Sequence, residues 1–288
     1  MTLKEFNAQD KAVASDALFT CCSSEKWTAL LLKEFPFSSE QSLISSATSI
    51  WYNECDPVDW QEAFAHHPKI GDVKGLTEKF GSTAHLASAE QSGVNSASGN
   101  VINELASGNK AYEEKFGFVF LVCATGKTAE EMLRLLQDRL QNEKEEEVSI
   151  AVGEQHKIML IRLKKMLHGA DWMWMKGSQL TTHVLDTSIG KPGQNITIRL
   201  QQMPEKEWRT FSQGVTNADG RIPDLLPPAR ILPPAIYKMV FETGRYFDDM
   251  DVKGFYPRVE IQFSISDDQH YHVPLLVNPF GYSTYRGS

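Results

Sequence analysis

The sequence predicts a multidomain fold in which an all-α N-terminal helical domain is followed by an all-β sandwich. Its 288 residues exceed the usual single-domain size of about 100 to 150 residues, so two domains are the first expectation. From Asn7 to about Leu167, apolar residues recur at intervals of three and four, the spacing of a helix face. Beyond that region they alternate with polar residues, which is typical of half-buried strands.

The helical segments of the first half have recognisable limits. Asp56 followed by Pro57 is typical of an N-cap with proline at the first helical position, and Pro68 ends that segment. Residues 127–140 place apolar side chains on one face, and 148–167 form a second long periodic segment. We interpret the acidic run 143–147 between them as a solvated helix start.

The second half has the pattern of a sandwich. Residues 195–201 and 259–265 alternate as strands do, and the Asn217-Ala218-Asp219-Gly220 turn and the proline-rich stretch 223–234 separate such segments. We therefore predict an antiparallel β-sandwich. The predicted limits are 1–167 for the helical domain, 168–180 for a linker whose Trp172 and Trp174 pack on a domain surface, and 181–288 for the sandwich.

Composition argues against several classes of partner. The net charge of -8 disfavours nucleic acid and anionic membrane surfaces. No apolar run approaches the roughly 18 residues that span a bilayer, and the first ten residues lack the features of a signal peptide. The four cysteines show no CxxC spacing and no histidine arranged with them for zinc, so we expect free thiols in a reducing compartment, no metal, and a cytoplasmic location.

Three residues of the second half stand apart from sandwich construction. His183 opens a strand, Arg221 follows the Asp219-Gly220 turn, and His272 lies in YHVPLL. A single histidine in a strand is usually structural, and an arginine after a turn is usually a solvated charge. The chain end YRGS adds a hydroxyl, a guanidinium and a terminal carboxylate, and it is this combination that indicates a site.

The segments HVLDTSIGKPGQNITI and YHVPLLVNPFGYSTYRGS resemble the two signatures of the transthyretin-like 5-hydroxyisourate hydrolases, over about residues 181 to 288. The resemblance implies a transthyretin-like sandwich, a homo-oligomer with tetrameric hydrolase domains, and an active site. That site would be lined by His183, Arg221, His272, Tyr285, Arg286 and Ser288. True transthyretins lack this set, which favours a hydrolase over a hormone carrier. Val277-Asn278 replaces the family's more frequent Leu-Ser, and we expect that change to affect strand packing.

Hydrolytic opening of a cyclic urate derivative requires a water that is nucleophilic near neutral pH. Histidine has the pKa for that task, and either His183 or His272 can be the base. Arg221 and Ser288 are candidates to donate to the developing oxyanion. The reaction needs no metal.

In the first half, two adjacent histidines precede Pro68 in HHPKIG. They can equally be a helix C-terminus placed favourably in the helix dipole. With EQSG and FGFVFLVCATGKT they resemble the motif set of the 2-oxo-4-hydroxy-4-carboxy-5-ureidoimidazoline (OHCU) decarboxylases, over about residues 5 to 167. The resemblance implies dimeric decarboxylase domains with catalytic His67 and Glu90, and His66 as a neighbour only. It implies substrate binding by Pro68, Ser88, Gln91, Phe118, Val119, Phe120, Leu121, Val122 and Arg162.

Decarboxylation without a cofactor needs an electron sink in the substrate, which a conjugated imidazoline ring supplies. The protein then has to place the substrate and manage one proton. We expect His67, held by Glu90, to handle that proton on one face of the ring, which gives a single enantiomer. The apolar FGFVF stretch would desolvate the departing carboxylate.

The fusion of both motif sets resembles the bifunctional allantoin synthases, since the hydrolase product is the decarboxylase substrate. The implied function is conversion of 5-hydroxyisourate to (S)-allantoin without cofactors. A small-molecule carrier would not need His183, Arg221, His272 and YRGS together, and a scaffold with one lapsed site would be expected to lose His67 or the tail. Some relatives carry a peroxisomal signal, which Arg162-Leu163 with His168 matches only loosely, so a cytoplasmic location is the expectation.

Overall fold

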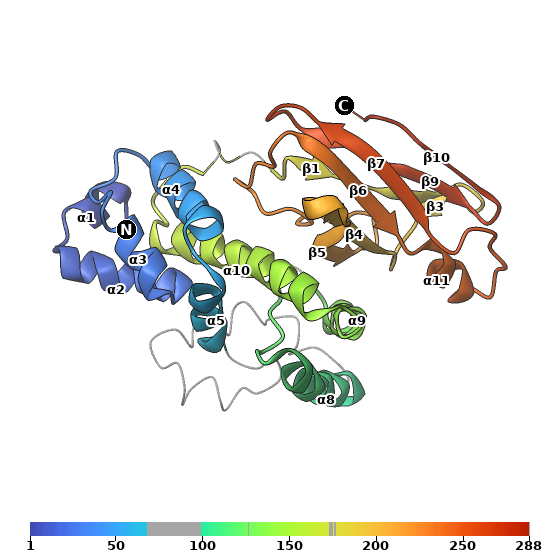
Figure 1. The fold of residues 1–288 in the computed structure, drawn as a ribbon, viewed down its shortest axis with the longest axis horizontal. Coiled ribbons are helices and arrows are strands. Elements are labelled where there is room, and N and C mark those ends of the chain that lie inside the picture. Colours follow the sequence, from blue (N-terminus) through green and yellow to red (C-terminus); the bar gives the residue numbers. More distant parts are fainter. Residues whose placement is uncertain (68–98, 126, 173–174, 176, 288) are drawn as a thin grey trace. The chain divides into compact units, whose positions relative to one another are not determined.

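The computed structural model describes residues 1–67, 99–125, 127–172, 175 and 177–287. The chain separates into two compact units, Met1–Gln141 with Glu154–Lys176, and Asn142–Gly153 with Gly177–Ser288. Helices make up the first half and strands the second (Figure 1), which confirms the predicted fold class. The domain limits at residues 167 and 181 remain predictions. No helix in the described part of the chain is long and apolar enough to cross a membrane.

Local capping chemistry sets where several helices begin. Capping boxes at Ser39, Asp56 and Thr128 start α4, α5 and α9, each side chain accepting a hydrogen bond from a backbone N–H of the first turn. Pro57 occupies the first turn of α5, as the sequence predicted. The described helices of this half are α1 (Leu3–Asn7), α2 (Lys11–Cys22), α3 (Glu25–Leu31), α4 (Glu40–Asn53), α5 (Pro57–Ala65), α8 (Gly99–Phe116), α9 (Ala129–Arg139) and α10 (Lys144–Met166).

The acidic run before the last long helix is only partly a solvated start. α10 begins at Lys144, so the run forms its first turn, and Glu145 is exposed as expected. Glu147 is instead fully buried and accepts a hydrogen bond from Asn142 Nδ2 at 2.8 Å. Successive residues of a helix differ by about 100° in direction, so one carboxylate of the run turns inward and requires a donor.

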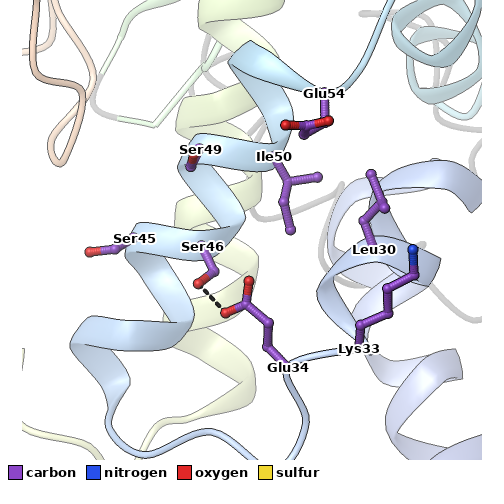
Figure 2. Close-up of a pocket in the computed structure, with 8 residues that line it drawn as sticks. All are labelled: Leu30, Lys33, Glu34, Ser45, Ser46, Ser49, Ile50 and Glu54. Carbon is purple, nitrogen blue, oxygen red and sulfur yellow. Dashed lines mark hydrogen bonds between the residues drawn. The ribbon is translucent and has the colours of Figure 1, made fainter.

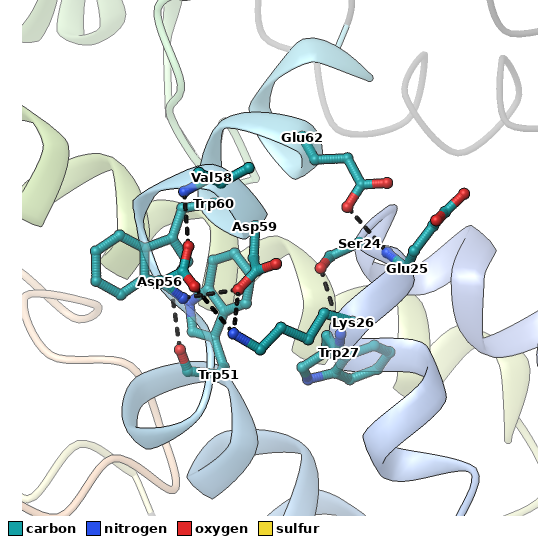
Figure 3. Close-up of polar contacts among 10 residues, drawn as sticks. All are labelled: Ser24, Glu25, Lys26, Trp27, Trp51, Asp56, Val58, Asp59, Trp60 and Glu62. Atoms are coloured by element: carbon teal, nitrogen blue, oxygen red, sulfur yellow. Dashed lines mark hydrogen bonds and ion pairs between the residues drawn. The ribbon is translucent and has the colours of Figure 1, made fainter.

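Helix α5 is fixed at its start by polar contacts and along its length by aromatic packing (Figure 3). Lys26 Nζ lies 3.0 Å from an Asp56 oxygen and 2.9 Å from an Asp59 oxygen. Lys26 and Asp56 are exposed to solvent, whereas Asp59 is only 13% exposed, so the contact positions the start of α5 more than it stabilises the fold. The fully buried Trp51 accepts, through its carbonyl, a hydrogen bond from Trp60 Nε1 at 3.2 Å. Helix α5 ends at Ala65 with His66 as its C-cap, and His67 follows directly.

The second unit contains two four-stranded sheets, in the orders β10-β9-β2-β3 and β5-β4-β6-β7, and a separate β1–β8 pair. Alternation predicted the inward residues correctly. On β4 and just before it, Ile196, Ile198 and Leu200 are fully buried. On β7, the side chains of Val259, Ile261 and Ile265 are at most 9% exposed. The strands are β1 (Leu180–Thr181), β2 (Val184–Asp186), β3 (Lys191–Pro192), β4 (Thr197–Gln202), β5 (Arg209–Val215), β6 (Ala235–Phe241), β7 (Val259–Ile265), β8 (Tyr271–His272), β9 (Leu275–Asn278) and β10 (Gly281–Thr284).

The sandwich differs from the predicted antiparallel one in two respects. Strand β2 pairs with β9 in parallel, and β1 pairs with β8 in parallel, so the first sheet is mixed. A short helix, α11 (Thr243–Asp248), also interrupts the strands. Turn residues in the sequence indicate hairpins between neighbouring strands. These parallel pairs join strands about 90 residues apart, and no local sequence pattern indicates such a pairing.

Candidate active sites

His67 is the centre of the candidate site in the helical half. It is 6% exposed, and its Nε2 lies 2.6 Å from Oε1 of Gln155, on α10. Gln155 is itself fully buried and donates from Nε2 to the carbonyl oxygen of Cys22 at 2.9 Å. Three elements, α2, α5 and α10, therefore hold one imidazole.

These contacts fix the tautomer of His67. A backbone carbonyl only accepts hydrogen bonds, so the amide nitrogen of Gln155 must face Cys22 and its oxygen must face the ring. An amide oxygen also only accepts, so His67 Nε2 carries the hydrogen. In the neutral ring Nδ1 is then the bare nitrogen, and it is the atom that can accept a proton.

Electrostatics keep this imidazole neutral. Burial, followed by the nearby charge of Arg162, lowers the pKa of His67 to about 3, and the contact with Gln155 opposes that shift. Arg162 is 4% exposed and lies seven residues after Gln155 on α10, so both polar side chains share one face of the helix. His67 is therefore a base, not a cation, near neutral pH.

The loop after α8 lies against the same region. Phe118 packs on Phe64 of α5 with ring centroids 5.1 Å apart. The Leu121 carbonyl accepts from Arg139 Nη1 at 2.6 Å, and the Cys123 N–H donates to the carboxylate of Glu154 at 2.6 Å. This loop is neither helix nor strand, so buried side chains supply partners to its backbone.

The predicted residues of this site are only partly covered by the structure. Phe118, Phe120, Leu121 and Val122 are buried, Val119 is half-buried, and Arg162 is close to His67. Gln155 and Glu154 were not predicted, although polar residues inside a long apolar helix were a usable signal. Pro68, Ser88, Glu90 and Gln91 lie outside the described residues, and so does the expectation that Glu90 holds His67.

The four cysteines are free, as predicted, and all four are buried. Burial raises the pKa of Cys21 and of Cys55 to about 12 in each case, and raises that of Cys22 well above its usual value. A thiol with a raised pKa holds little thiolate, which is the reactive form. Cys21, Cys22 and Cys55 are therefore packing residues.

A surface cavity of about 490 Å³ between α3 and α4 includes none of the residues of the two histidine sites in its lining (Figure 2). Lys33, Glu34 and Glu54 line it together with several serines, and Ser46 donates to Glu34 across it. Its lining includes no histidine, the residue type that the sequence predicts as the base of both reactions.

In the sandwich, two predicted histidines are in direct contact. His183 Nδ1 lies 2.7 Å from His272 Nε2, and the rings stack with centroids 4.9 Å apart. Burial first, then the positive charge of Arg221, lowers the pKa of His183. Burial, His183 and Arg221 likewise lower the pKa of His272. Both rings are therefore largely neutral near pH 7.

Backbone pairing brings Arg221 to His183. The two residues form an isolated β-bridge, and the Val184 N–H donates to the Gly220 carbonyl at 2.8 Å. Gly220 has a φ of +69°, and a Cβ there would lie 2.3 Å from the Val184 oxygen. Only glycine combines a positive φ with the absence of a Cβ, so glycine is required in the turn that brings Arg221 to His183.

Two further residues of this site were not predicted. Thr181 Oγ1 lies 2.8 Å from His272 Nδ1 and 2.9 Å from His270 Nε2. His270 precedes His272 by two residues, and period-two alternation places both on one face. That spacing was the available signal.

The tail also reaches His272. Gly287 forms a β-bridge with His272 and donates its N–H to the His272 carbonyl at 2.9 Å. The guanidinium of Arg286 stacks on the Tyr271 ring at 5.0 Å. Tyr285 is half exposed, and Ser288 lies outside the described residues.

Gly287→Ala tests whether the tail holds His272 in place. A Cβ at this position would lie 2.4 Å from His272 Cδ2, so the imidazole must move. We expect the hydrolysis predicted for the sandwich to fall by about tenfold or more, because small displacements of a catalytic group are costly, with the decarboxylation predicted for the helical half unchanged. Stopped-flow absorbance measures the first activity. Wild-type hydrolysis by a folded Gly287→Ala protein would contradict this role.

In the part of the chain that the structure describes, no group of three or more histidine, cysteine or acidic residues is arranged to hold a metal ion. The polar groups that are brought together are imidazoles, guanidiniums, a carboxamide and a hydroxyl. Such groups bind polar ring systems and move protons.

Comparisons with known proteins agree with this arrangement. Residues 7–164 match the family model described as OHCU decarboxylase, and 180–287 match that of the HIUase/Transthyretin family. The uric acid degradation bifunctional protein TTL of Arabidopsis thaliana is 30% identical over 325 residues, covering 96% of this chain and 99% of that protein. The 5-hydroxyisourate hydrolase of Mus musculus is 45% identical over 119 residues, covering 40% of this chain and all of that protein.

Among solved structures, that of an (S)-allantoin synthase is similar over the full length of both chains, with 26% identity and a TM-score of 0.46. The family matches follow one another along the sequence, the first on the helical half and the second on the sandwich. The chain therefore belongs to the family of bifunctional uric acid degradation proteins, in which an OHCU decarboxylase region precedes an HIUase/transthyretin region.

Proposed function

We propose that this protein converts 5-hydroxyisourate to allantoin in two steps, hydrolysis in the sandwich and decarboxylation in the helical half. The observation that carries the proposal is the order of two matched families on one chain, each with a buried or half-buried histidine centre. The hydrolysis product is the substrate of the decarboxylation, so the pairing has a chemical purpose.

For hydrolysis, His183 is the better base of the stacked pair. His272 uses both ring nitrogens in hydrogen bonds, to His183 and to Thr181, whereas the contacts of His183 with described residues involve Nδ1. Nε2 of His183 can therefore take a proton from water. Arg221 stabilises the oxyanion that forms, and Arg286 and Tyr285 bind the substrate, with Ser288 as a further donor.

For decarboxylation, the substrate carboxylate leaves as carbon dioxide and the ring imine accepts the electron pair. Nδ1 of His67 is bare and accepts a substrate proton, since Gln155 supports the positive charge that follows. The ring can then return that proton to one face of the product carbon. Phe118 and Phe120 exclude water from the departing carboxylate. The product we propose is (S)-allantoin, with no cofactor in either step.

Assembly and location are part of the same proposal. Phe280, Tyr282 and Tyr285, at or beside the edge strand β10, expose large aromatic surfaces, which supports association of the hydrolase domains. The homo-oligomer that we propose has tetrameric hydrolase and dimeric decarboxylase domains. Light scattering on the purified chain tests it. Free buried thiols support a reducing, cytoplasmic setting.

The decisive experiment generates 5-hydroxyisourate from urate with urate oxidase and then adds the protein. Absorbance decay follows hydrolysis, and circular dichroism follows the appearance of optically active allantoin. We expect both to accelerate over the spontaneous reactions. Racemic allantoin formed at the spontaneous rate would refute the decarboxylase half, and unaccelerated absorbance decay would refute the hydrolase half.

Gln155→Leu tests the proposed tautomer of His67. The change removes the acceptor for Nε2–H and leaves a buried donor unpaired, so we expect decarboxylation to fall by about tenfold while hydrolysis stays normal. Gln155→Glu keeps an acceptor and adds negative charge, so the pKa of His67 rises and the pH profile moves upward. Gln137→Leu, at an exposed position on α9, is the matched control. Equal rates for Gln155→Leu and the control would contradict this role.

A further inference from the structure

Four side chains of the sandwich form one hydrogen-bonded row. His183 Nδ1 contacts His272 Nε2 at 2.7 Å, His272 Nδ1 contacts Thr181 Oγ1 at 2.8 Å, and that oxygen contacts His270 Nε2 at 2.9 Å. Parallel pairing of β1 with β8 aligns Thr181 with His272. The row runs from the proposed base to His270, whose side chain is exposed to solvent.

The row can be ordered continuously in two directions. A neutral imidazole has one N–H and one bare nitrogen, and a threonine hydroxyl donates one proton while accepting others. If every group donates toward His270, Nε2 of His183 is bare and can act as a base. If every group donates toward His183, its Nε2 carries a hydrogen and can act as an acid.

We propose that Thr181 and His270 are positioning residues that connect the histidine pair to solvent as a proton relay for hydrolysis. The inference rests on the proposed assignment of hydrolysis to His183 and His272. It gives the hydroxyl and the outer imidazole a function that neither family signature assigned in the sequence.

Each bond change in the relay balances. The water O–H bond breaks as its oxygen bonds to the substrate carbonyl carbon, the carbonyl π electrons move to the carbonyl oxygen as an oxyanion beside Arg221, and the proton goes to His183 Nε2. The Nδ1 proton of His183 moves to His272 Nε2, the Nδ1 proton of His272 moves to Thr181, and the threonine proton moves to His270 Nε2. His270 releases its Nδ1 proton to bulk water. The row is then reversed. As the oxyanion re-forms the carbonyl, the ring C–N bond breaks with its electron pair going to nitrogen, His183 Nε2 protonates that nitrogen, and His270 takes a proton back from bulk water.

The surroundings explain why the charge should leave the histidine pair. Burial and Arg221 lower the pKa of both His183 and His272, so an imidazolium there is unfavourable. A cation on the exposed His270 is hydrated instead. The relay thus removes a proton from water without placing an imidazolium of the histidine pair beside the guanidinium of Arg221.

The test measures hydrolysis of 5-hydroxyisourate by the full chain. We expect Thr181→Val to lower kcat by about tenfold with little change in KM, and Thr181→Ser to recover most of the loss. His270→Gln keeps a hydrogen-bonding side chain that cannot take up a proton. Its kcat should fall at low buffer concentration and recover with added imidazole. Thr187→Val removes a threonine hydroxyl that donates to the Val277 carbonyl and is outside the row, and it should behave as wild type.

Three results would overturn the relay. The first is a wild-type kcat in both Thr181→Val and His270→Gln. The second is equal impairment of Thr181→Ser and Thr181→Val, and the third is a His270→Gln defect that imidazole does not relieve. Decarboxylation by the same proteins shows that the chain is intact, and Thr181→Ser and His270→Gln test the relay even if Thr181→Val fails to fold. If His183→Asn hydrolyses normally, the assignment of the site fails. If His183→Asn is inactive but the relay variants are normal, only the relay fails.

Discussion

His67→Asn should remove fast formation of optically active allantoin while leaving hydrolysis of 5-hydroxyisourate at its wild-type rate. Asparagine can still donate to Gln155, but it has no basic nitrogen to replace the bare Nδ1. Loss of a general base typically costs about 10² to 10⁴ in rate. Absorbance at the 5-hydroxyisourate band gives the first step, and circular dichroism gives the second.

The control for this variant is His168→Asn, which makes the same change at an exposed position of the helical half. Because His67 is buried, thermal unfolding of the variant must also be compared with that of wild type. A folded His67→Asn protein that still forms one enantiomer at the wild-type rate would remove His67 from the mechanism, whatever the role of Gln155.

His183→Asn should have the opposite effect. The variant loses the one imidazole whose Nε2 is proposed to face water, so hydrolysis should fall by about 10² to 10⁴. Decarboxylation should be unaffected when the ureidoimidazoline is supplied, because His67, Gln155 and Arg162 all belong to the helical unit. The substrate is made in situ with urate oxidase and a separate 5-hydroxyisourate hydrolase, and allantoin is followed by circular dichroism.

Supplying that separate hydrolase is also the control, since it should restore the full reaction of His183→Asn. Failure of this rescue in a folded protein would show that the two activities are not divided between His183 and His67. Unchanged hydrolysis would instead refute the assignment of hydrolysis to the His183 and His272 pair.

The parts of the fold that sequence could predict are those with local physical causes. Asp56 and Pro57 start a helix through contacts within one turn, and the alternation around Ile198 follows from one wet and one dry face of a sheet. The parallel pairing of β2 with β9 depends on residues about 90 positions apart, so no local pattern encodes it.

The same distinction applies to the sites. His67, His183, Arg221 and His272 were identified by family motifs, which are short stretches of sequence. Gln155 lies 88 positions from the histidine that it contacts, and no motif marks it. His270 was within reach of sequence reasoning, because its spacing from His272 places both on one strand face.

Three residues of helix α10 contact or lie near the His67 region. Glu154 accepts a hydrogen bond from the loop after α8, Gln155 orients His67, and Arg162 lies near the His67 ring. Deleting one residue between Glu154 and Arg162 would rotate the following part of the helix by about 100° and draw it back along the helix axis by about 1.5 Å. The loop anchor and Arg162 could then no longer face the same region. Over these two turns the chain should therefore tolerate changes of side chain far better than changes of length.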